Sequence, residues 1–558
     1  MPWSDELNEP QAQAVAHAHG PLLVFAGAGS GKTRVITYRI ANLVAEHRVA
    51  PYRILAVTFT NKAAGEMRAR LARLVGEDIA KELWVGTFHA TCARLLRRHG
   101  QAVGVPSNFV IYDAQDQRTV VARAIKELKL DDKRYPPRQL LAAIQKEKQE
   151  ARGPDDMRGT GVGYMDDAIG RVFQRYEAAL AAAGAVDFDD LIGKTRKLLL
   201  SDDEAAQKLK RRFDHVLVDE FQDTNLLQYE LVRLLASGTR NLCVVGDDDQ
   251  SIYRWRGADR RNILGFRRDY PDATVVKLEQ NYRSTSNVVK AALAVIEPSA
   301  DREPKELWTE NEPGAPLEVI AVRDEHEEAA YVVQTLSGLR EEGQDLRDTA
   351  VFYRVHAQSR VLEESLRAAR IPYRIVGGMK FFERAEVKDA LAYLRVVVND
   401  KSDVDLLRII NVPARGIGQA TLDRLSSFAS SRGISVYEAL SHADDAPDIT
   451  GAPLKKLRAV RELLAALKKA CAEKSPTDAL IHVLDTTGYL VALQEDGSVE
   501  ATSRLENLRE LVGSVRDYEV EAVSAGEQAT LEGFLERVTL RTDGDEETDG
   551  GSVTLMTV

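Results

Sequence analysis

The stretch AGAGSGKT, residues 26–33, follows the apolar run PLLVF and combines three glycines with a lysine and a threonine. The run predicts a short buried strand, the glycines permit a tight turn, and TRVITYRIANLV has the apolar spacing of a helix. At such a junction backbone N–H groups face phosphates, Lys32 adds a positive charge and the Thr33 hydroxyl ligates Mg²⁺. Ala26 replaces the usual first glycine, a small departure because it only ends the strand. We expect an ATP site, the alternative being a flexible turn before an ordinary helix.

Two carboxylates follow another apolar run, in VLVDEFQDT at residues 216–224. A strand that ends in Asp219 and Glu220 places one carboxylate beside Mg²⁺ and the next where it can orient and deprotonate water. Acidic pairs that merely cap strands are common, so this interpretation depends on the pairing with GSGKT. The sequence shows nothing that resembles the kinase loop motifs. We therefore expect hydrolysis rather than transfer of phosphate to a substrate hydroxyl.

The segment GDDDQSIYRWRGAD, residues 246–259, gathers acids, a glutamine, two aromatics and two arginines. Tyr253 and Trp255 alternate with Arg254 and Arg256, which favours a half-exposed surface over the alternative of two core aromatics. Aromatic rings interleaved with arginine suit stacking on bases, which contributes about 1–3 kcal/mol per base without sequence preference. The segment predicts binding of single-stranded nucleic acid.

Composition limits the remaining possibilities. The chain has 558 residues and a net charge of −11, so any contact with nucleic acid must use local basic patches. Its three cysteines include no CxxC pair, which argues against a disulfide framework or a zinc site. The acidic start MPWSDELNEP and the lack of long apolar runs indicate neither export nor membrane insertion. A cytoplasmic protein fits these features.

The order of expected elements indicates an α/β fold with several domains. Strand and helix patterns alternate around LLVFA, ILAVTF and LWVGTF, and strand patterns recur in LEVIAV (317–322), TAVFYR (349–354), YRIVGG (373–378) and SVTLMTV (552–558). Two long helical stretches interrupt them. The predicted divisions are 1–88 (first sheet domain), 89–190 (helical insertion), 191–280 (first sheet domain resumed), 281–380 (second sheet domain), 381–550 (helical insertion) and 551–558 (return strand).

These motifs together resemble a known family. LNEPQAQAV, AGAGSGKT, VTFTNKAAGEM, VGTFHA, VDEFQDTN, GDDDQSIYRWRGA and LEQNYRS occur in the order found in superfamily 1 DNA helicases of the UvrD/Rep/PcrA type. The resemblance covers essentially the whole chain. It implies two RecA-like P-loop NTPase domains, each interrupted by a mainly helical insertion, that move 3′ to 5′ on single-stranded DNA and unwind duplex DNA, with a role in DNA repair.

The resemblance also implies roles for single residues at the nucleotide. Gln11 would contact the adenine edge and Tyr282 would stack on the adenine. Gln250 would sense the γ-phosphate, and Arg283 would neutralise it from the second domain across a cleft. The nucleotide-binding set is then Gln11, Gly27, Gly29, Ser30, Gly31, Lys32, Thr33, Arg34, Tyr282 and Arg283.

For DNA the predicted contacts form two groups. The first group is Phe59, Asn61, His89, Tyr253, Trp255 and Arg256. His89 has the alternative of a buried, hydrogen-bonded residue. In VPARGIGQATLDRL, residues 412–425, Gly416, Gly418 and Thr421 resemble a helix-hairpin-helix grip on duplex phosphates, the alternative being a plain turn between helices.

The expected partners are single-stranded DNA and single-strand/duplex junctions, with other repair proteins possible and no membrane, for a monomer or DNA-induced dimer in the bacterial cytoplasm near the nucleoid. The alternatives are the motor subunit of a helicase-nuclease, an ATP-dependent DNA-binding protein without unwinding, and a motor of opposite polarity. In the family, the final strand SVTLMTV runs into further residues that include a second γ-phosphate arginine. We therefore expect an incomplete second sheet and a chain truncated at its C-terminus.

Overall fold

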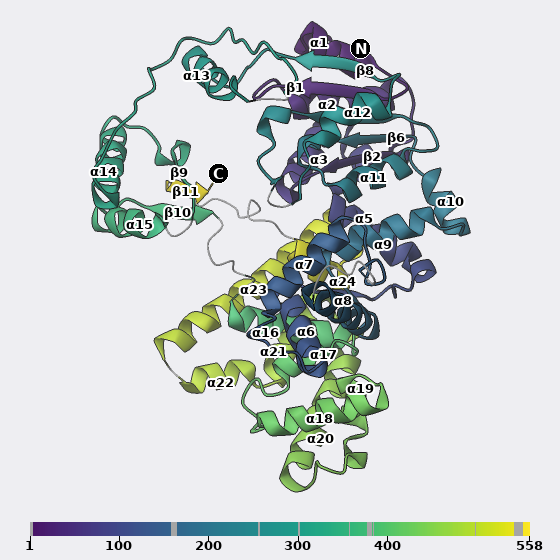
Figure 1. The fold of residues 1–558 in the computed structure, drawn as a ribbon. Helices are drawn as coiled ribbons and strands as arrows, with labels where there is room; N and C mark the ends of the chain where they lie inside the picture. Colours follow the sequence, from purple (N-terminus) through teal and green to yellow (C-terminus); the bar gives the residue numbers. More distant parts are fainter. Residues whose placement is uncertain are drawn as a thin grey trace.

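The computed structural model describes residues 4–157, 164–254, 257–299, 302–355, 358–376, 382, 384–496, 498–540 and 551–557. Over these ranges the chain forms parallel sheets separated by long helical regions (Figure 1). The α/β class expected from the alternating patterns is confirmed.

The first sheet has six parallel strands in the order β3-β2-β6-β7-β1-β8. The carboxyl ends of parallel strands lie along one edge of a sheet, so the loops after β1, β6 and β7 meet there. These loops carry the residues in AGAGSGKT, VDEFQDT and GDDDQ. The strands are β1 (Leu22–Ala26), β2 (Ile54–Thr58), β3 (Trp84–Thr87), β6 (His215–Val218), β7 (Leu242–Gly246) and β8 (Thr274–Leu278).

Both faces of this sheet are covered by helices, so its strands are mainly apolar. In β1 the side chains of Leu22 and Val24 join one core, while those of Leu23 and Phe25 join the other. The helices around the sheet are α1 (Glu9–Ala16), α2 (Lys32–Ala45), α3 (Asn61–Val75), α4 (Glu77–Glu82), α5 (Phe88–His99), α9 (Phe188–Leu200), α10 (Glu204–Lys210), α11 (Leu226–Leu235) and α12 (Arg261–Asp269). A further helix, α13 (Ser286–Ile296), follows the sheet in the chain.

A helical region interrupts the first sheet between β3 and β6, where the sequence predicts an insertion. Its core forms around α6 (Ala114–Glu127), α7 (Pro137–Gln149) and α8 (Tyr164–Ala182), beside a two-stranded parallel sheet of β4 (Val110–Ile111) and β5 (Ala185–Val186). At its base, Lys148 is buried against three carboxylates. Its Nζ lies 2.7 Å from both Glu177 and Asp187 and 2.9 Å from Asp190.

The second sheet is smaller and has the strand order β10-β11-β9. The strands are β9 (Ala350–Tyr353), β10 (Tyr373–Val376) and β11 (Val553–Thr557). Two helices, α14 (Glu325–Glu341) and α15 (Ser359–Ala368), contribute to its core. The predicted strands in TAVFYR, YRIVGG and SVTLMTV are therefore confirmed, and the last one returns across the chain to pair between the other two.

The predicted strand in LEVIAV is wrong. Residues 315–322 form neither helix nor strand, and Val319 is 96% exposed. A strand requires a neighbouring backbone to accept and donate its hydrogen bonds, and none pairs with this segment among the described residues. The alternation of apolar and other residues in LEVIAV is typical of a strand, but the segment pairs with no other strand in the described part of the chain.

A second helical region lies between β10 and β11 and forms the largest apolar core. Its helices are α16 (Ala385–Val398), α17 (Asp403–Ile409), α18 (Gln419–Arg432), α19 (Val436–Ser441), α20 (Gly451–Cys471), α21 (Pro476–Thr486), α22 (Tyr489–Asp496), α23 (Val499–Ser524) and α24 (Leu531–Leu540). In Figure 1 it lies beside the first helical region. Ion pairs join the two, including Lys388 to Asp113 at 2.8 Å and Arg395 to Asp116 at 3.3 Å.

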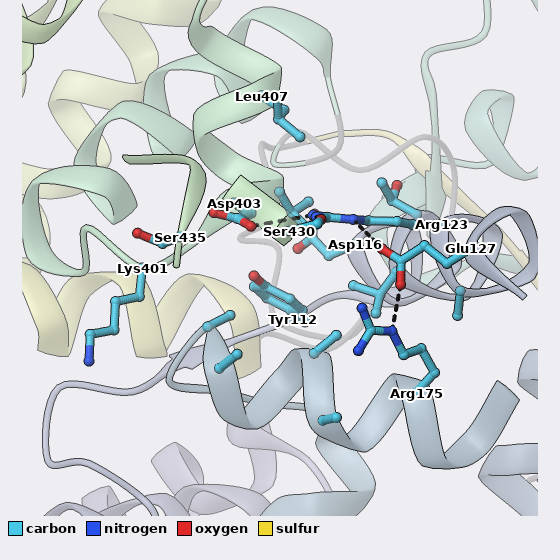
Figure 2. A pocket seen from close by; sticks show the side chains of 18 of the residues that line it. Tyr112, Asp116, Arg123, Glu127, Arg175, Lys401, Asp403, Leu407, Ser430 and Ser435 are labelled. Atoms are coloured by element: carbon cyan, nitrogen blue, oxygen red, sulfur yellow. Dashed lines mark hydrogen bonds and ion pairs between the residues drawn. The ribbon is translucent and has the colours of Figure 1, made fainter. Parts of the chain in front are cut away.

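A cavity of about 660 Å³ lies between these helical regions. Figure 2 shows Arg123 reaching from α6 to Asp403 of α17, while Glu127 accepts from both Arg123 and Arg175. Arg123, Glu127, Arg175 and Asp403 thus form a chain of ion pairs along this cavity. In the part of the chain that the structure describes, no helix is both long and apolar enough to cross a membrane.

Substitution of Lys148 tests the contribution of the buried charge cluster to stability. We expect Lys148→Met to lower the free energy of unfolding by about 3–5 kcal/mol, because it leaves buried carboxylates without their cation. Denaturant unfolding followed by circular dichroism measures this, with Lys146→Met on the exposed face of the same helix as the matched control. A change no larger than that of the control would contradict the proposed charge balance.

Candidate nucleotide and nucleic-acid site

The loop between β1 and α2 has its carbonyl groups turned away from the space where phosphates would lie. Gly29 and Gly31 have φ angles of 67° and 89°, in the left-handed region that favours glycine. Four consecutive carbonyls accept hydrogen bonds from groups around the loop, and the amides that begin α2 remain as donors for a ligand. The four bonds are Ser30 Oγ to Gly27 O (2.7 Å), Asn281 Nδ2 to Ala28 O (2.6 Å), Tyr282 N to Gly29 O (2.9 Å) and Gln11 Nε2 to Ser30 O (2.9 Å).

Lys32 begins α2 and points to the acids after β6. Its Nζ lies 2.6 Å from Glu220 Oε2 and 3.4 Å from Gln250 Oε1. Gln222 donates to the same Glu220 oxygen at 2.9 Å. Glu220 has a φ of 50°, a conformation that costs a non-glycine residue roughly 1–2 kcal/mol. Backbone strain of this kind is common where a side chain must be aimed precisely.

Asp219 lies beside this pair and is buried at the end of β6. Burial, together with the neighbouring Glu220 carboxylate, raises the pKa of Asp219 to about 7 against the opposing effect of Lys32. The Thr33 side chain lies close enough to Asp219 to favour the charged carboxylate and so lower that pKa in turn. A hydroxyl and a buried carboxylate that lacks a full countercharge are oxygen donors of the kind Mg²⁺ prefers, so these residues fit the metal expected from the sequence.

The residues predicted to contact the base lie beside the same loop. Gln11 is buried, and it accepts from Asn8 N and donates to Ser30 O, which positions it as a support of the loop. Tyr282 is exposed, and its hydroxyl accepts from Asn8 Nδ2 at 2.8 Å. Arg34 is exposed on the first turn of α2. Contact of these side chains with adenine stays a prediction.

Arg283 is placed differently from the expectation that it approaches from the second sheet. The chain leaves β8 and turns at Asn281, whose Oδ1 accepts from the backbone N–H of Arg283 at 2.9 Å. A Cβ built on Gly29 would lie 2.8 Å from the Cβ of Arg283. The arginine therefore reaches the phosphate loop from the same sheet, because the Asn281 bonds hold this turn against the loop.

Two predicted DNA-binding aromatics meet at the ends of neighbouring loops. Phe59 follows β2 and Tyr253 follows β7, and their rings stack with centroids 5.9 Å apart and an interplanar angle of 13°. Asn61 begins α3, two residues beyond Phe59. Trp255 and Arg256 lie outside the described residues. The structure thus brings together aromatic rings from two motifs that are far apart in the sequence.

His89 lies in the first turn of α5, with its ring edge-on to Phe188 at a centroid distance of 5.5 Å. Burial lowers the pKa of His89 to about 4. The imidazole is neutral at physiological pH, so any contact with DNA would use its ring or a hydrogen bond rather than positive charge.

The predicted duplex contact is a loop that precedes α18. Gly416 has a φ of 68°, and its carbonyl accepts from Lys456 Nζ at 2.7 Å. Gly418 caps α18, and Thr421 follows in the first turn. The loop is held from inside, because Asn411 Oδ1 accepts from the backbone of Arg415 at 2.9 Å. This geometry leaves the N-terminus of a long helix beside a lysine, and its use for DNA stays a prediction.

Sequence reasoning missed several residues that build the site. Asn281 ties the phosphate loop to the end of β8, Gln222 holds Glu220, and Lys305 neutralises the acids after β7. Asn281 lies in LEQNYRS and Gln222 in VDEFQDTN, so both belong to motifs that indicate the nucleotide site. Lys305 follows a helix and stands outside every motif considered, and only the folded chain reveals its position.

Comparison with known proteins agrees with the geometry. Residues 7–271 match the model of the UvrD/REP helicase N-terminal domain, and residues 276–558 match that of the UvrD-like helicase C-terminal domain. The chain is 43% identical over 552 residues to ATP-dependent DNA helicase PcrA of Staphylococcus epidermidis, covering 99% of this chain and 75% of that protein. The protein of the same name from Staphylococcus aureus is 42% identical over 554 residues, with the same coverage. The chain therefore belongs to the UvrD/Rep family of helicases.

Proposed function

We propose that this chain is an ATP-dependent DNA helicase that moves 3′ to 5′ on single-stranded DNA and acts in DNA repair. One observation carries the proposal. A single short segment after β7 holds both Gln250, which contacts Lys32, and Tyr253, which stacks on Phe59. A change at the nucleotide is thus connected to the aromatic pair through a few residues of backbone.

At the nucleotide, the loop amides and Lys32 would bind the phosphates, and Thr33 with Asp219 would hold Mg²⁺, which neutralises charge on the phosphate oxygens. Glu220 accepts from Lys32 in the structure. Once phosphate takes over that ammonium, the Glu220 carboxylate is free to orient a water and accept its proton. Gln250, which contacts Lys32, and Arg283, whose Cβ lies beside Gly29, would stabilise charge on the γ-phosphate.

At the DNA, Phe59 and Tyr253 offer aromatic faces for bases. The two rings stack on each other, so a base that inserts between them must separate them. Stacking does not depend on base identity, so binding would be indifferent to sequence, and phosphate contacts would make it salt-dependent. Opening and closing of this pair with each nucleotide cycle would release and grip successive bases.

The DNA substrate, cellular location and oligomeric state are proposed from membership of the helicase family alone. We propose action at single-strand/duplex junctions in the bacterial cytoplasm, near the nucleoid, as a monomer or DNA-induced dimer alongside other repair proteins. The loop at Gly416 and Gly418 would then contact the duplex backbone through amides and the α18 N-terminus.

Removal of the Lys32 ammonium tests the nucleotide site. We expect Lys32→Ala to lower the kcat for ATP by about 10²–10³-fold, the usual effect of losing one donor to developing negative charge. Binding of single-stranded DNA should persist, because Lys32 faces Glu220 rather than the aromatic pair. Steady-state hydrolysis and fluorescence anisotropy measure the two, with exposed Lys197→Ala as control. Undiminished turnover would refute the assignment.

Substitution of Tyr253 tests the DNA surface. We expect Tyr253→Ala to weaken binding of single-stranded DNA by about 1–3 kcal/mol, because one stacking face is lost, while Tyr253→Phe keeps the ring and most of the affinity. Titration of a labelled oligonucleotide measures this, with the exposed Tyr52→Ala as a matched aromatic control. Equal affinity for the alanine variant and the parent would place Tyr253 outside the DNA path.

Strand displacement tests direction and distinguishes the alternatives. We expect ATP to drive release of the complement from a duplex with a 3′ single-stranded tail and not from one with a 5′ tail. Glu220→Gln serves as the control, because it removes the proposed base while retaining the shape of the side chain. Release from the 5′-tailed substrate alone would reverse the polarity, and hydrolysis without any release would indicate a DNA-dependent ATPase that does not unwind.

A further inference from the structure

Three consecutive aspartates after β7 enclose the ammonium group of Lys305. Its Nζ forms ion pairs with Asp247 Oδ1, with Asp248 Oδ1 at 2.7 Å and with Asp249 Oδ2 at 3.1 Å. The Lys305 side chain is 0% exposed. A lysine is almost never fully buried unless it is paired, so this arrangement is specific.

Lys305 belongs to a segment, residues 302–308, that crosses the edge of the first sheet; we call it the strap. Arg302 binds Asp249 through two nitrogens at 3.0 and 2.6 Å, and Glu303 N donates to Asp248 at 2.9 Å. At the other end Trp308 N donates to Glu279 O at 3.0 Å. Both ends of the strap are therefore anchored, and Lys305 lies between them.

The acids after β7 do not form a site for a metal in this arrangement. Burial alone would lower the pKa of Lys305, but the carboxylates of Asp247 and Asp248 outweigh it and hold that pKa above its usual value. The ammonium is charged and fills the position where a cation would bind. The cluster is an internal set of ion pairs that can hold neighbouring side chains in place.

Asp247 uses its two oxygens in different directions. Oδ1 accepts from Lys305, whereas Oδ2 accepts from Gln250 Nε2 at 2.7 Å. With its nitrogen held by Asp247, the Gln250 amide presents its oxygen to Lys32 Nζ at 3.4 Å. Lys305 and the backbone N–H of Asp249 thus hold the carboxylate that orients the Gln250 amide.

We propose that Lys305 is a positioning residue for ATP hydrolysis, which acts through Asp247 to orient Gln250 toward the nucleotide. This inference rests on the proposed function. Without the ammonium, Asp247 Oδ1 keeps the backbone N–H of Asp249 at 3.2 Å but loses its charged partner. The carboxylate that sets the direction of the Gln250 amide is then held less firmly. Binding of ATP depends on the loop and Lys32, so the loss should appear in turnover rather than in affinity.

The experiment compares Lys305→Met with Lys290→Met, an exposed lysine on α13. We expect Lys305→Met to lower the kcat of DNA-stimulated hydrolysis by about 10²-fold, the effect of a small misplacement of a reacting group. Affinity for a fluorescent ATP analogue should stay within about twofold of the parent, and Lys290→Met should match the parent in both.

A double-mutant cycle distinguishes positioning from general support of the fold. If Lys305 acts through Gln250, adding Lys305→Met to Gln250→Ala should lower kcat by no more than about twofold further. Independent, multiplicative losses would overturn the inference, as would a kcat near that of the parent or a parallel loss of ATP affinity.

A second variant keeps the test decisive if Lys305→Met destabilises the chain, because that change leaves buried carboxylates without a cation. Lys305→Met combined with Asp248→Asn removes one negative charge with the positive one and retains Asp247. The same loss of kcat is expected, and recovery of parental turnover would overturn the inference. Absence of hydrolysis in the parent would refute the proposed function and this inference with it, whereas a hydrolysing parent with an unaffected variant refutes the inference alone.

Discussion

A loop that offers its backbone amides to phosphate must place its carbonyl groups elsewhere, since both sets of atoms belong to the same few peptide units. In this chain four consecutive carbonyls from Gly27 to Ser30 are bound by groups that come from α1, from the segment after β8 and from the loop itself. The phosphate loop is therefore shaped by partners distant in the sequence. The parallel order of the sheet is what makes this possible, because it places β8 directly beside β1.

The same order of strands determines how charge is balanced at the site. β6 and β7 are neighbours, so Asp219 and Glu220 lie next to the three aspartates that follow β7. Buried carboxylates at this density require cations. Lys32 pairs with Glu220 in the first group, and Lys305 pairs with the aspartates of the second. Gln250 lies between the two lysines and forms hydrogen bonds with Asp247 and with Lys32. The paired strands bring the catalytic segments together, and these ion pairs and hydrogen bonds orient their side chains.

The sequence predicts the elements whose signals are local. Apolar runs identify the strands in LLVFA, ILAVTF and LWVGTF and the one that ends before Asp219, and AGAGSGKT and VDEFQDT identify two of the loops. Pairing partners are not local, which is why LEVIAV carries a strand pattern without forming a strand and why Arg283 approaches from an unexpected side. The role of Lys305 cannot be predicted from the sequence for the same reason. A lysine in REPKELW has no feature that separates it from a solvated surface residue until the chain folds back onto Asp247.

The short stretch of backbone that joins Gln250 to Tyr253 allows a physical account of how nucleotide and DNA influence each other. Gln250 is held by Asp247 on one side and Lys32 on the other, while Tyr253 stacks on Phe59 across the sheet edge. Phosphate that draws Lys32 away from Gln250 removes one of these restraints, and a base that inserts between Phe59 and Tyr253 removes another. A coupling of 1–3 kcal/mol, about 5–150-fold in affinity, is typical between linked sites, and loss of a single stacking or charged hydrogen bond is of that size. Thermodynamic linkage then requires the effect to run in both directions, so DNA that stabilises one arrangement of this segment must favour the nucleotide state that shares it.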